Sequence, residues 1–254
     1  IAIEIVSLSL TGVTGPIVGP VTGPVPLNPD LNHEGSGGSF TYQATDTALA
    51  VSGTGTATIS VTAVNDAPVC SDLSVTLTED TPDVAVLPCS DPDAGDTIAI
   101  EIVALSLTGV SGPLVGPVNG PVALNPDLNH NGSGGSFTYF ATDIIGAVSG
   151  TSTASIDVTA VNDAPVCPDI AATITEDVSG SVSLPCSDPD IGDTIAIEIL
   201  ILSLTGVSGP FLGPVTGPVP LNPDLNHNGS GGSFTYQATD TSVAVSGTGT
   251  ATIS

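Results

Sequence analysis

The sequence of 254 residues contains no Lys and no Arg, against 26 acidic residues. Nothing in the chain can neutralise phosphate groups, which excludes nucleic acid as a partner, and the same argument excludes an anionic membrane surface. Each carboxylate must therefore be balanced by solvent cations, by a bound metal ion or by a partner. Trp and Met are also absent, and aromatic residues make up 3% of the chain, so any core consists mainly of Val, Ile, Leu, Ala and Thr.

Long apolar runs are missing as well. No stretch reaches the roughly 18 consecutive apolar residues of a membrane helix, so we expect no membrane span in this fragment. A net charge of −26 raises the question of disorder, but 40% of the residues are hydrophobic, which is enough to bury a core. No Ser–His–Asp or paired-carboxylate pattern stands in a distinct site, and no basic side chain could stabilise an anion. We therefore expect no enzyme.

The chain repeats itself with a step of 97 residues. The sequence Ile-Ala-Ile-Glu-Ile begins at Ile1, Ile98 and Ile195. Since 254/97 is about 2.6 and a step of this size is that of a small domain, we expect tandem modules. The predicted limits are 1–66 for a partial module with strands C to G, 67–163 for a complete module, and 164–254 for a module that lacks the end of its last strand.

Strand signals dominate each module. Segments such as 74–78, 97–102 and 154–159 alternate apolar and polar residues, Gly and Pro separate them, and no helical period is sustained. Roughly seven short strands in 97 residues predict an all-β fold, a tandem array of immunoglobulin-like Greek-key β-sandwiches. In the central module we expect strands A (about 70–78), B (about 84–89), C (about 97–107), F (about 136–142) and G (about 151–162).

Alternating the strand directions places the acidic residues at the two ends of a module. Glu79, Asp80, Asn162 and Asp163 fall at the end that meets the next module. The opposite end receives a second set of carboxylates, namely Asp91, Asp93, Asp96 and Asp143. In a head-to-tail array one end faces the other, so acidic residues scattered through the sequence should converge at each junction.

The four cysteines follow the same repeat. Cys70 and Cys89 are equidistant from the turn at Glu79, so they should lie opposite each other at the open end of an A–B hairpin, and Cys167 and Cys186 repeat the arrangement. We predict two disulfide bonds within modules, each closing a loop of ~20 residues and contributing ~3 kcal/mol, in an oxidising compartment. The alternatives are reduced, buried thiols and, less compatible with the spacing, a metal site.

Four motifs in order resemble the cadherin-like (VCBS- or cadherin-type) tandem repeats of large bacterial surface proteins. They are the linker Val-Asn-Asp-Ala-Pro-Val at 161–166, Thr-Glu-Asp at 175–177, the Ser-Asp-Pro-Asp-Ile-Gly-Asp segment at 187–193, and Ala-Thr-Asp at 238–240. The resemblance covers nearly all of each module. The linker departs from the animal form at Ala160 and Ala164, and Asn-His-Asn-Gly-Ser-Gly-Gly at 226–232 replaces an acidic motif. These departures imply one or two ions per junction instead of three.

The cofactor that this reading implies is calcium, which takes six to eight oxygen ligands from carboxylates and carbonyls. The candidate ligands at the first junction are Asn65, Asp66, Asp91, Asp93 and Asp143. Those at the second junction are Glu79, Asp80, Asn162, Asp163, Asp188, Asp190 and Asp240. The alternative is that these are ordinary solvated turn residues, because Asp and Asn favour loops.

Two further features repeat outside the junctions. Asn131-Gly-Ser133 and Asn228-Gly-Ser230 are glycosylation sequons, whereas the first copy carries Glu34 at this position. The segment 108–121 is too rich in Pro for a central strand. It is either a long loop or edge hairpin that covers its own sandwich, or a lateral contact surface between chains or modules.

These features together predict an extracellular or cell-surface structural protein. We expect a rod-like array that forms the stalk of an adhesin or the body of a filament, stiffened by calcium at its junctions. Its partners would be neighbouring modules and, in a filament, further copies of the chain. The competing interpretation is an adhesive module that binds a carbohydrate or a protein. Against this, positions 140 and 144–146 read Phe and Ile-Ile-Gly, where the first copy has Gln and Thr-Ala-Leu, although a ligand site used in every module should repeat.

Overall fold

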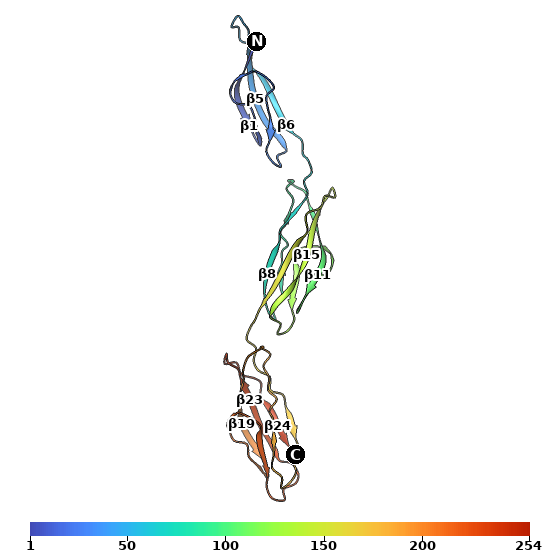
Figure 1. Ribbon diagram of the computed structural model, residues 1–254, viewed down its shortest axis with the longest axis vertical. Coiled ribbons are helices and arrows are strands. Elements are labelled where there is room, and N and C mark those ends of the chain that lie inside the picture. The colour runs from blue at the N-terminus through green and yellow to red at the C-terminus, as the bar shows by residue number, and fades with distance from the viewer.

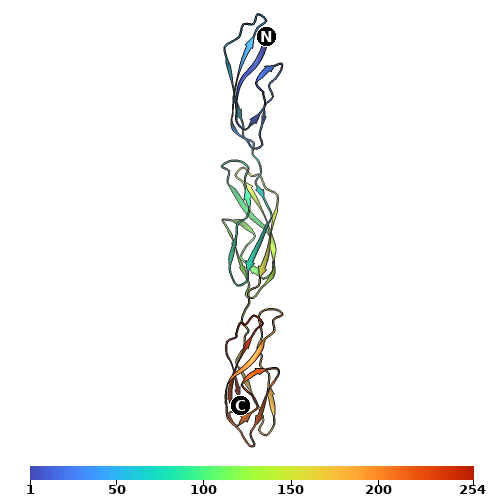
Figure 2. The same ribbon diagram turned by 90° about the vertical axis from the view of Figure 1, so that its left-hand side faces the viewer.

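The computed structural model describes all 254 residues, and its strands form three groups that follow one another along the molecule (Figure 1, Figure 2). The first group has β1 (Ala2–Leu10), β2 (Val13–Thr14), β3 (Gly19–Val21), β4 (Asn28–Pro29), β5 (Gly35–Thr45) and β6 (Gly55–Val61). The second has β7 (Val69–Cys70), β8 (Leu73–Thr78), β9 (Asp83–Ala85), β10 (Cys89–Ser90), β11 (Ile98–Leu107), β12 (Val110–Ser111), β13 (Gly116–Val118), β14 (Val122–Pro126), β15 (Gly132–Asp143) and β16 (Ser152–Thr159). The third has β17 (Ile170–Ala172), β18 (Gly180–Val182), β19 (Ala196–Leu204), β20 (Val207–Ser208), β21 (Gly213–Val215), β22 (Val219–Pro223), β23 (Gly232–Thr239) and β24 (Gly249–Ile253).

Each of the last two groups is a sandwich of a larger and a smaller sheet. In the second group the larger sheet has the order β13-β11-β15-β16-β8 and the smaller one the order β12-β14-β9. The third group repeats both sheets as β17-β24-β23-β19-β21 and β18-β22-β20. The all-β fold of tandem β-sandwiches is thus confirmed, while the limits of the modules stay a prediction.

The core lies between the two sheets because alternate strand residues face inward. Along β16 every second residue from Ser152 to Val158 is buried. In the second group the large core side chains include Leu124, Phe137 and Tyr139, all exposed by 1% or less. The first group has no counterparts of β7 to β10, and its Tyr42 is accordingly 40% exposed.

The predicted strand A is wrong in one respect, because the chain changes sheets halfway along it. β7 pairs with β10, whereas β8 pairs in parallel with β16. The crossing is held by the Tyr139 hydroxyl, which donates to the carbonyl of Ser71 over 2.5 Å, and by Asp72, which accepts from the backbone N–H of Thr153 over 2.7 Å. Strand B is divided too, since β9 pairs with β14. A continuous A–B hairpin therefore does not form.

The disulfide bonds are nevertheless present as predicted. Cys70 and Cys89 are paired residues of the short β7–β10 ladder and form one bond, and Cys167 and Cys186 form the other. No cysteine is free. The cysteines mark the part of the A–B pairing that does exist, so their equal distance from Glu79 led to the right partners for an incomplete reason.

The segment 108–121 contributes one short strand to each of the two sheets. β12 pairs with β14 in the smaller sheet, and β13 then forms the edge of the larger sheet beside β11. Pro117 within β13 has no N–H, so it is compatible with an edge strand and not with a central one. The segment accordingly covers an open side of the sandwich, as one of the two interpretations expected.

Candidate metal centres at the junctions

Two linkers join the groups of strands, and each is fastened to the module that follows it. At the first junction the Asn65 side-chain amide donates to Asp143 Oδ2 over 2.8 Å, and the Asp66 N–H donates to Asp93 Oδ2 over 2.7 Å. At the second junction Asn162 donates to Asp240 Oδ2 over 2.8 Å and the Asp163 N–H to Asp190 Oδ2 over 2.8 Å. The repeat therefore extends to the hydrogen bonds of the joint.

Glu79 connects the preceding module to the second junction. It follows β8, is 1% exposed, and its N–H donates to the carbonyl of Thr159 over 3.1 Å. Its Oε1 accepts from the N–H of Val161 over 2.5 Å. These contacts fix the Glu79 carboxylate against the start of the linker.

Three carboxylates from both sides of the second junction converge there. Carboxylate oxygens of Glu79, Asp163 and Asp190 lie within 4.8 Å of one another. Glu79 ends a strand of one module, Asp163 belongs to the linker, and Asp190 lies in the loop that precedes β19 of the next module. The strand directions predicted this convergence, and the structure shows its geometry.

A second type of cluster lies wholly within one module. Asp188, Asp190 and Asp193 bring their carboxylates within 4.8 Å, and Asp91, Asp93 and Asp96 repeat the arrangement at the first junction. The loop folds on itself, since Asp188 Oδ1 accepts from the N–H of Asp190 over 2.9 Å. Asp190 belongs to both clusters of the second junction.

Several of these carboxylate oxygens are buried without a hydrogen-bond donor. They are Glu79 Oε2, Asp91 Oδ2, Asp163 Oδ2 and Asp188 Oδ2. A buried anionic oxygen without a partner is unfavourable, and such groups in native proteins call for an explanation such as an ion. Because hard oxygens are the ligands that calcium prefers, the residues fit the ion that the sequence implies.

Burial and the crowding of like charges raise the pKa of two carboxyl groups in the clusters. Burial, together with the charges of Asp80, Asp190, Glu79 and Asp188, raises the pKa of Asp163 above its ordinary value. Burial and the neighbouring Asp91, Asp93, Asp143 and Glu34 raise the pKa of Asp96 in the same way. The charged form of both residues is therefore disfavoured unless a cation balances it.

Asp143 and Asp240 have a different environment, since both carboxylate oxygens of each residue accept hydrogen bonds from donors within the protein. Asp143 Oδ1 accepts from three backbone N–H groups, those of Ile145, Gly146 and Ala147, at 2.6 to 2.9 Å. The Asn65 amide, which is the largest influence, and these backbone groups hold the pKa of Asp143 below its ordinary value, although burial opposes them. Asn162 does the same for the pKa of Asp240.

Asp80 is likewise engaged within its own module. Its backbone has a φ of 61°, and its Oδ1 accepts from the N–H of Asn129 over 2.9 Å. Asp177 makes the same bond to Asn226 over 2.9 Å. Because both bonds lie within a single module, they belong to the fold of the module.

Sequence reasoning placed Asp96 at a junction without naming it as a ligand, and it left Asp193 and Glu34 out of the ligand sets. The signal for the two aspartates was the repeated Asp-Pro-Asp-x-Gly-Asp, whose last carboxylate recurs with the first two. Glu34 lies near Asp96 across the first junction, where it borders a cavity of about 350 Å³ together with Asp66 and Asp93. Its role depends on a neighbouring module, which no local motif reveals.

The sequon residues Asn131 and Asn228 are exposed, and their glycosylation stays a prediction. None of the secondary-structure elements is a helix that could cross a membrane.

A comparison with protein families places the sequence among bacterial modules. A family model described as "Bacterial Ig domain" matches residues 65–159 and again 162–254. No curated protein matches the sequence.

The structure is similar to solved cadherin ectodomains. Drosophila N-cadherin EC1-4 is 20% identical with a TM-score of 0.39, and protocadherin gamma B7 extracellular cadherin domains 1-4 are 14% identical with a TM-score of 0.49. Each match covers 99% of this chain and 66% of the other. Mouse cadherin-23 EC22-24 is 16% identical with a TM-score of 0.46, covering 99% of this chain and 86% of that one. This chain therefore spans slightly less than two thirds of the first two.

Proposed function

The chain belongs to the Bacterial Ig domain family, and on that premise we propose that it is a structural segment of an extracellular or cell-surface array whose junctions bind calcium. The role is mechanical and not catalytic. Cation binding would convert a flexible series of β-sandwiches into a stiff rod, which suits the stalk of an adhesin or the body of a filament.

One observation carries the proposal. Glu79 is buried to 1% exposure, its Oε2 has no donor, and it converges with Asp163 and Asp190 across the second junction. No Lys or Arg exists in the chain to balance these charges. A divalent cation would supply the balance and would also tie the preceding module to the following one.

The residues divide into ligands and supports. Glu79, Asp163, Asp188 and Asp190 would hold the ion, with Asp193 completing the cluster of the following module. Asn162 and Asp240 form the hydrogen-bonded pair that fastens the linker. At the first junction Asp91, Asp93 and Asp96 would hold an ion, with Asp66 beside them and the Asn65–Asp143 pair as the support.

An extracellular location agrees with the covalent structure. Both disulfide bonds require an oxidising compartment to persist. Each joins two cysteines that are 19 positions apart in the sequence. A rod exposed outside the cell needs such cross-links, because cores built from few aromatic residues gain less from burial.

The proposal is tested by titrating calcium into the chelated protein. We expect heat of binding in calorimetry, a rise in the thermal midpoint, and a narrower distribution of end-to-end distances in small-angle X-ray scattering. Magnesium serves as the control ion, because its smaller, stricter octahedral shell fits these clusters less well. Absence of heat together with an unchanged midpoint after chelation would overturn the proposal.

A further inference from the structure

Each module carries one long stretch without charge on an otherwise acidic chain. No Asp or Glu stands between Glu4 and Asp30, between Glu101 and Asp127, or between Glu198 and Asp224. Each stretch contains the edge strand of the larger sheet, β3, β13 or β21. Two exposed apolar residues precede each edge strand closely: Ile17 and Val18, Leu114 and Val115, and Phe211 and Leu212. Phe211 is 79% exposed and Leu212 64%.

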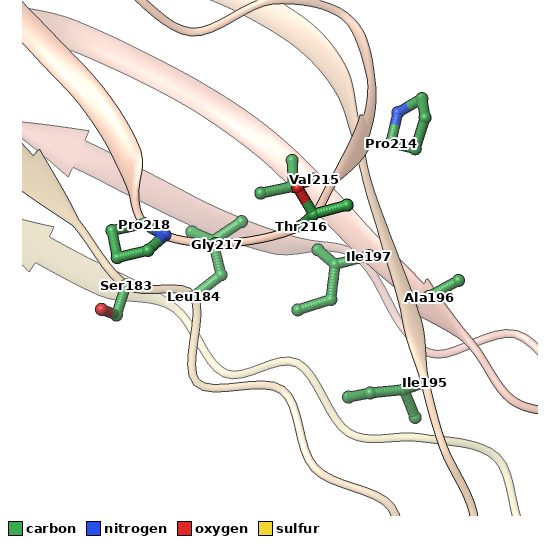
Figure 3. A pocket seen from close by; sticks show the side chains of 10 residues that line it. All are labelled: Ser183, Leu184, Ile195, Ala196, Ile197, Pro214, Val215, Thr216, Gly217 and Pro218. Carbon is green, nitrogen blue, oxygen red and sulfur yellow. The ribbon is translucent and has the colours of Figure 1, made fainter.

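An apolar groove lies on the same edge of the third module. It has a volume of about 580 Å³ and runs between β19 with its preceding residue Ile195, the segment 183–184, and the segment 214–218. Figure 3 shows the side chains of Ile195 and Ile197 pointing toward the segment that carries Leu184. The groove contains no titratable side chain, so an apolar group is the occupant that its lining favours.

A second hollow also borders the segment 214–218, and it has a counterpart in the first module. In the third module it measures about 280 Å³ and includes Ile199 and Phe211. Its counterpart in the first module measures about 510 Å³ and includes Ile5 and Ile17 at the equivalent positions. The hollow is thus shared by the first and third modules.

We propose that this edge is a lateral docking surface for a second copy of the chain, in which Phe211 and Leu212 of one copy enter the groove beside Ile195 and Ile197 of the other. The projecting pair and the groove lie on one edge, so two copies related by a twofold axis can exchange them, as an isologous contact requires. Direct strand pairing is not the mode of contact, because Pro214 in β21 lacks an N–H and blocks the edge.

Charge limits where a second copy of this chain can dock. Two chains of net charge −26 repel each other over most of their surfaces. They can approach most closely where carboxylates are few, and along this edge of the third module the exposed Glu198, paired with Pro214, is the single acidic residue between Ala196 and Pro223. A cationic partner would instead be drawn to the junctions and away from this surface.

The arrangement of the modules predicts the form of the assembly. In Figure 1, β1 and β19 lie on the left of their modules, whereas β11 lies on the right of its own. Their partners β3, β21 and β13 form the outer edges beside them. The edges that carry the exposed apolar pairs therefore face opposite sides in successive modules, and one chain can contact a neighbour on each side. Weak contacts repeated along the chain then add up through multivalency.

The test is sedimentation velocity of the whole chain over a concentration series in a chelator, with F211S/L212S as the variant and L225S as the control. Leu225 is also exposed, at 81%, but lies outside the edge. We expect the mass of the unchanged chain to rise with concentration, and to rise further when salt increases from about 0.01 to about 1 M, because screening weakens the repulsion.

The double substitution should weaken association at least tenfold, and L225S should leave it unchanged. Both changed residues of the variant are exposed, so folding is preserved, which circular dichroism checks. A monomer at every concentration and salt, or equal association of the F211S/L212S variant, would overturn the proposal. Because the chelator removes calcium, this outcome is independent of the junction proposal.

Discussion

The two junctions share their hydrogen bonds but differ in their carboxylates. Both have the Asn–Asp pair and the aspartate N–H donor, at distances of 2.7 to 2.8 Å. At the second, Glu79 contributes to a cluster that spans two modules. Glu34 stands near Asp96 at the first junction, whereas the corresponding residue of the second module is Asn131.

The difference separates two tasks of a joint. The hydrogen bonds orient the linker on the module that follows, and they need no ion. Glu79, the acidic residue that follows β8, brings the preceding module into the same cluster. A cation held only by Asp91, Asp93 and Asp96 would stabilise a loop, whereas a cation that also contacts Glu79 would join two modules.

The largest expected effect comes from removing the covalent bond that follows each junction. The C167S/C186S variant should lower the free energy of unfolding of its module by ~3 kcal/mol, because a loop of about 20 residues is released in the unfolded chain. C70S/C89S should cost the second group of strands a similar amount, since both bonds have a separation of 19 residues. Denaturant unfolding measures both. If only one of the two variants lost stability, the two disulfide bonds would not contribute equally to the modules that follow the junctions.

Next in size is the loss of Glu79. E79Q should weaken calcium binding at the second junction at least tenfold, about 1.4 kcal/mol, because it removes the charge that spans the modules. The matched control is E176Q, the same change at the equivalent residue of the third module, which is exposed. Calorimetry should distinguish the two variants. If both variants weakened calcium binding equally, or if neither weakened it, the assigned role of Glu79 would be contradicted.

A smaller effect is expected from the Asn–Asp pairs. N162A should raise the pKa of Asp240 and lower stability at neutral pH, and N65A should do the same through Asp143. A lowered carboxyl pKa gives stability that is present above the ordinary value of 3.8 and is lost as pH falls through the lowered value. Unfolding in a chelator across this range should show that both variants lose less stability on acidification than the unchanged chain. If stability depended on pH differently in the two variants, the two hydrogen bonds would not be equivalent.

The smallest effect concerns Glu34, the last of the groups that raise the pKa of Asp96. E34N copies the residue of the second module and should lower the pKa of Asp96 slightly, since one negative charge is removed. Carboxyl chemical shifts in a pH titration measure this change. An Asp96 that titrates as before would show that Glu34 does not act across the first junction.

Local patterns predicted a large part of this molecule. Alternating residues revealed β11, β15 and β16, because burial on one face leaves a period of two in the sequence. The limits of β11 were close to those predicted, whereas β15 begins earlier, at Gly132, and β16 ends earlier, at Thr159. Strand direction alone brought Glu79, Asp163 and Asp190 to one place. The cysteine partners followed from their distances to Glu79.

Other features depend on pairing between distant strands, which no local pattern records. The sheet change between Cys70 and Leu73 arises because β16 accepts β8 on its free edge. Asp143 has the same residue type as Asp163, yet backbone donors occupy one and like charges surround the other. Apolar residues at Phe211 and Leu212 could equally have packed inward.

By itself, the sequence determined the 97-residue module, its all-β class, its cysteine pairs and the acidic character of its joints. These properties follow from residue period, spacing and the absence of basic side chains. Only the tertiary structure decided which carboxylates are left without donors and which apolar residues stay exposed. The physical reason is that hydrogen-bond saturation and burial depend on what the folded chain places around each side chain.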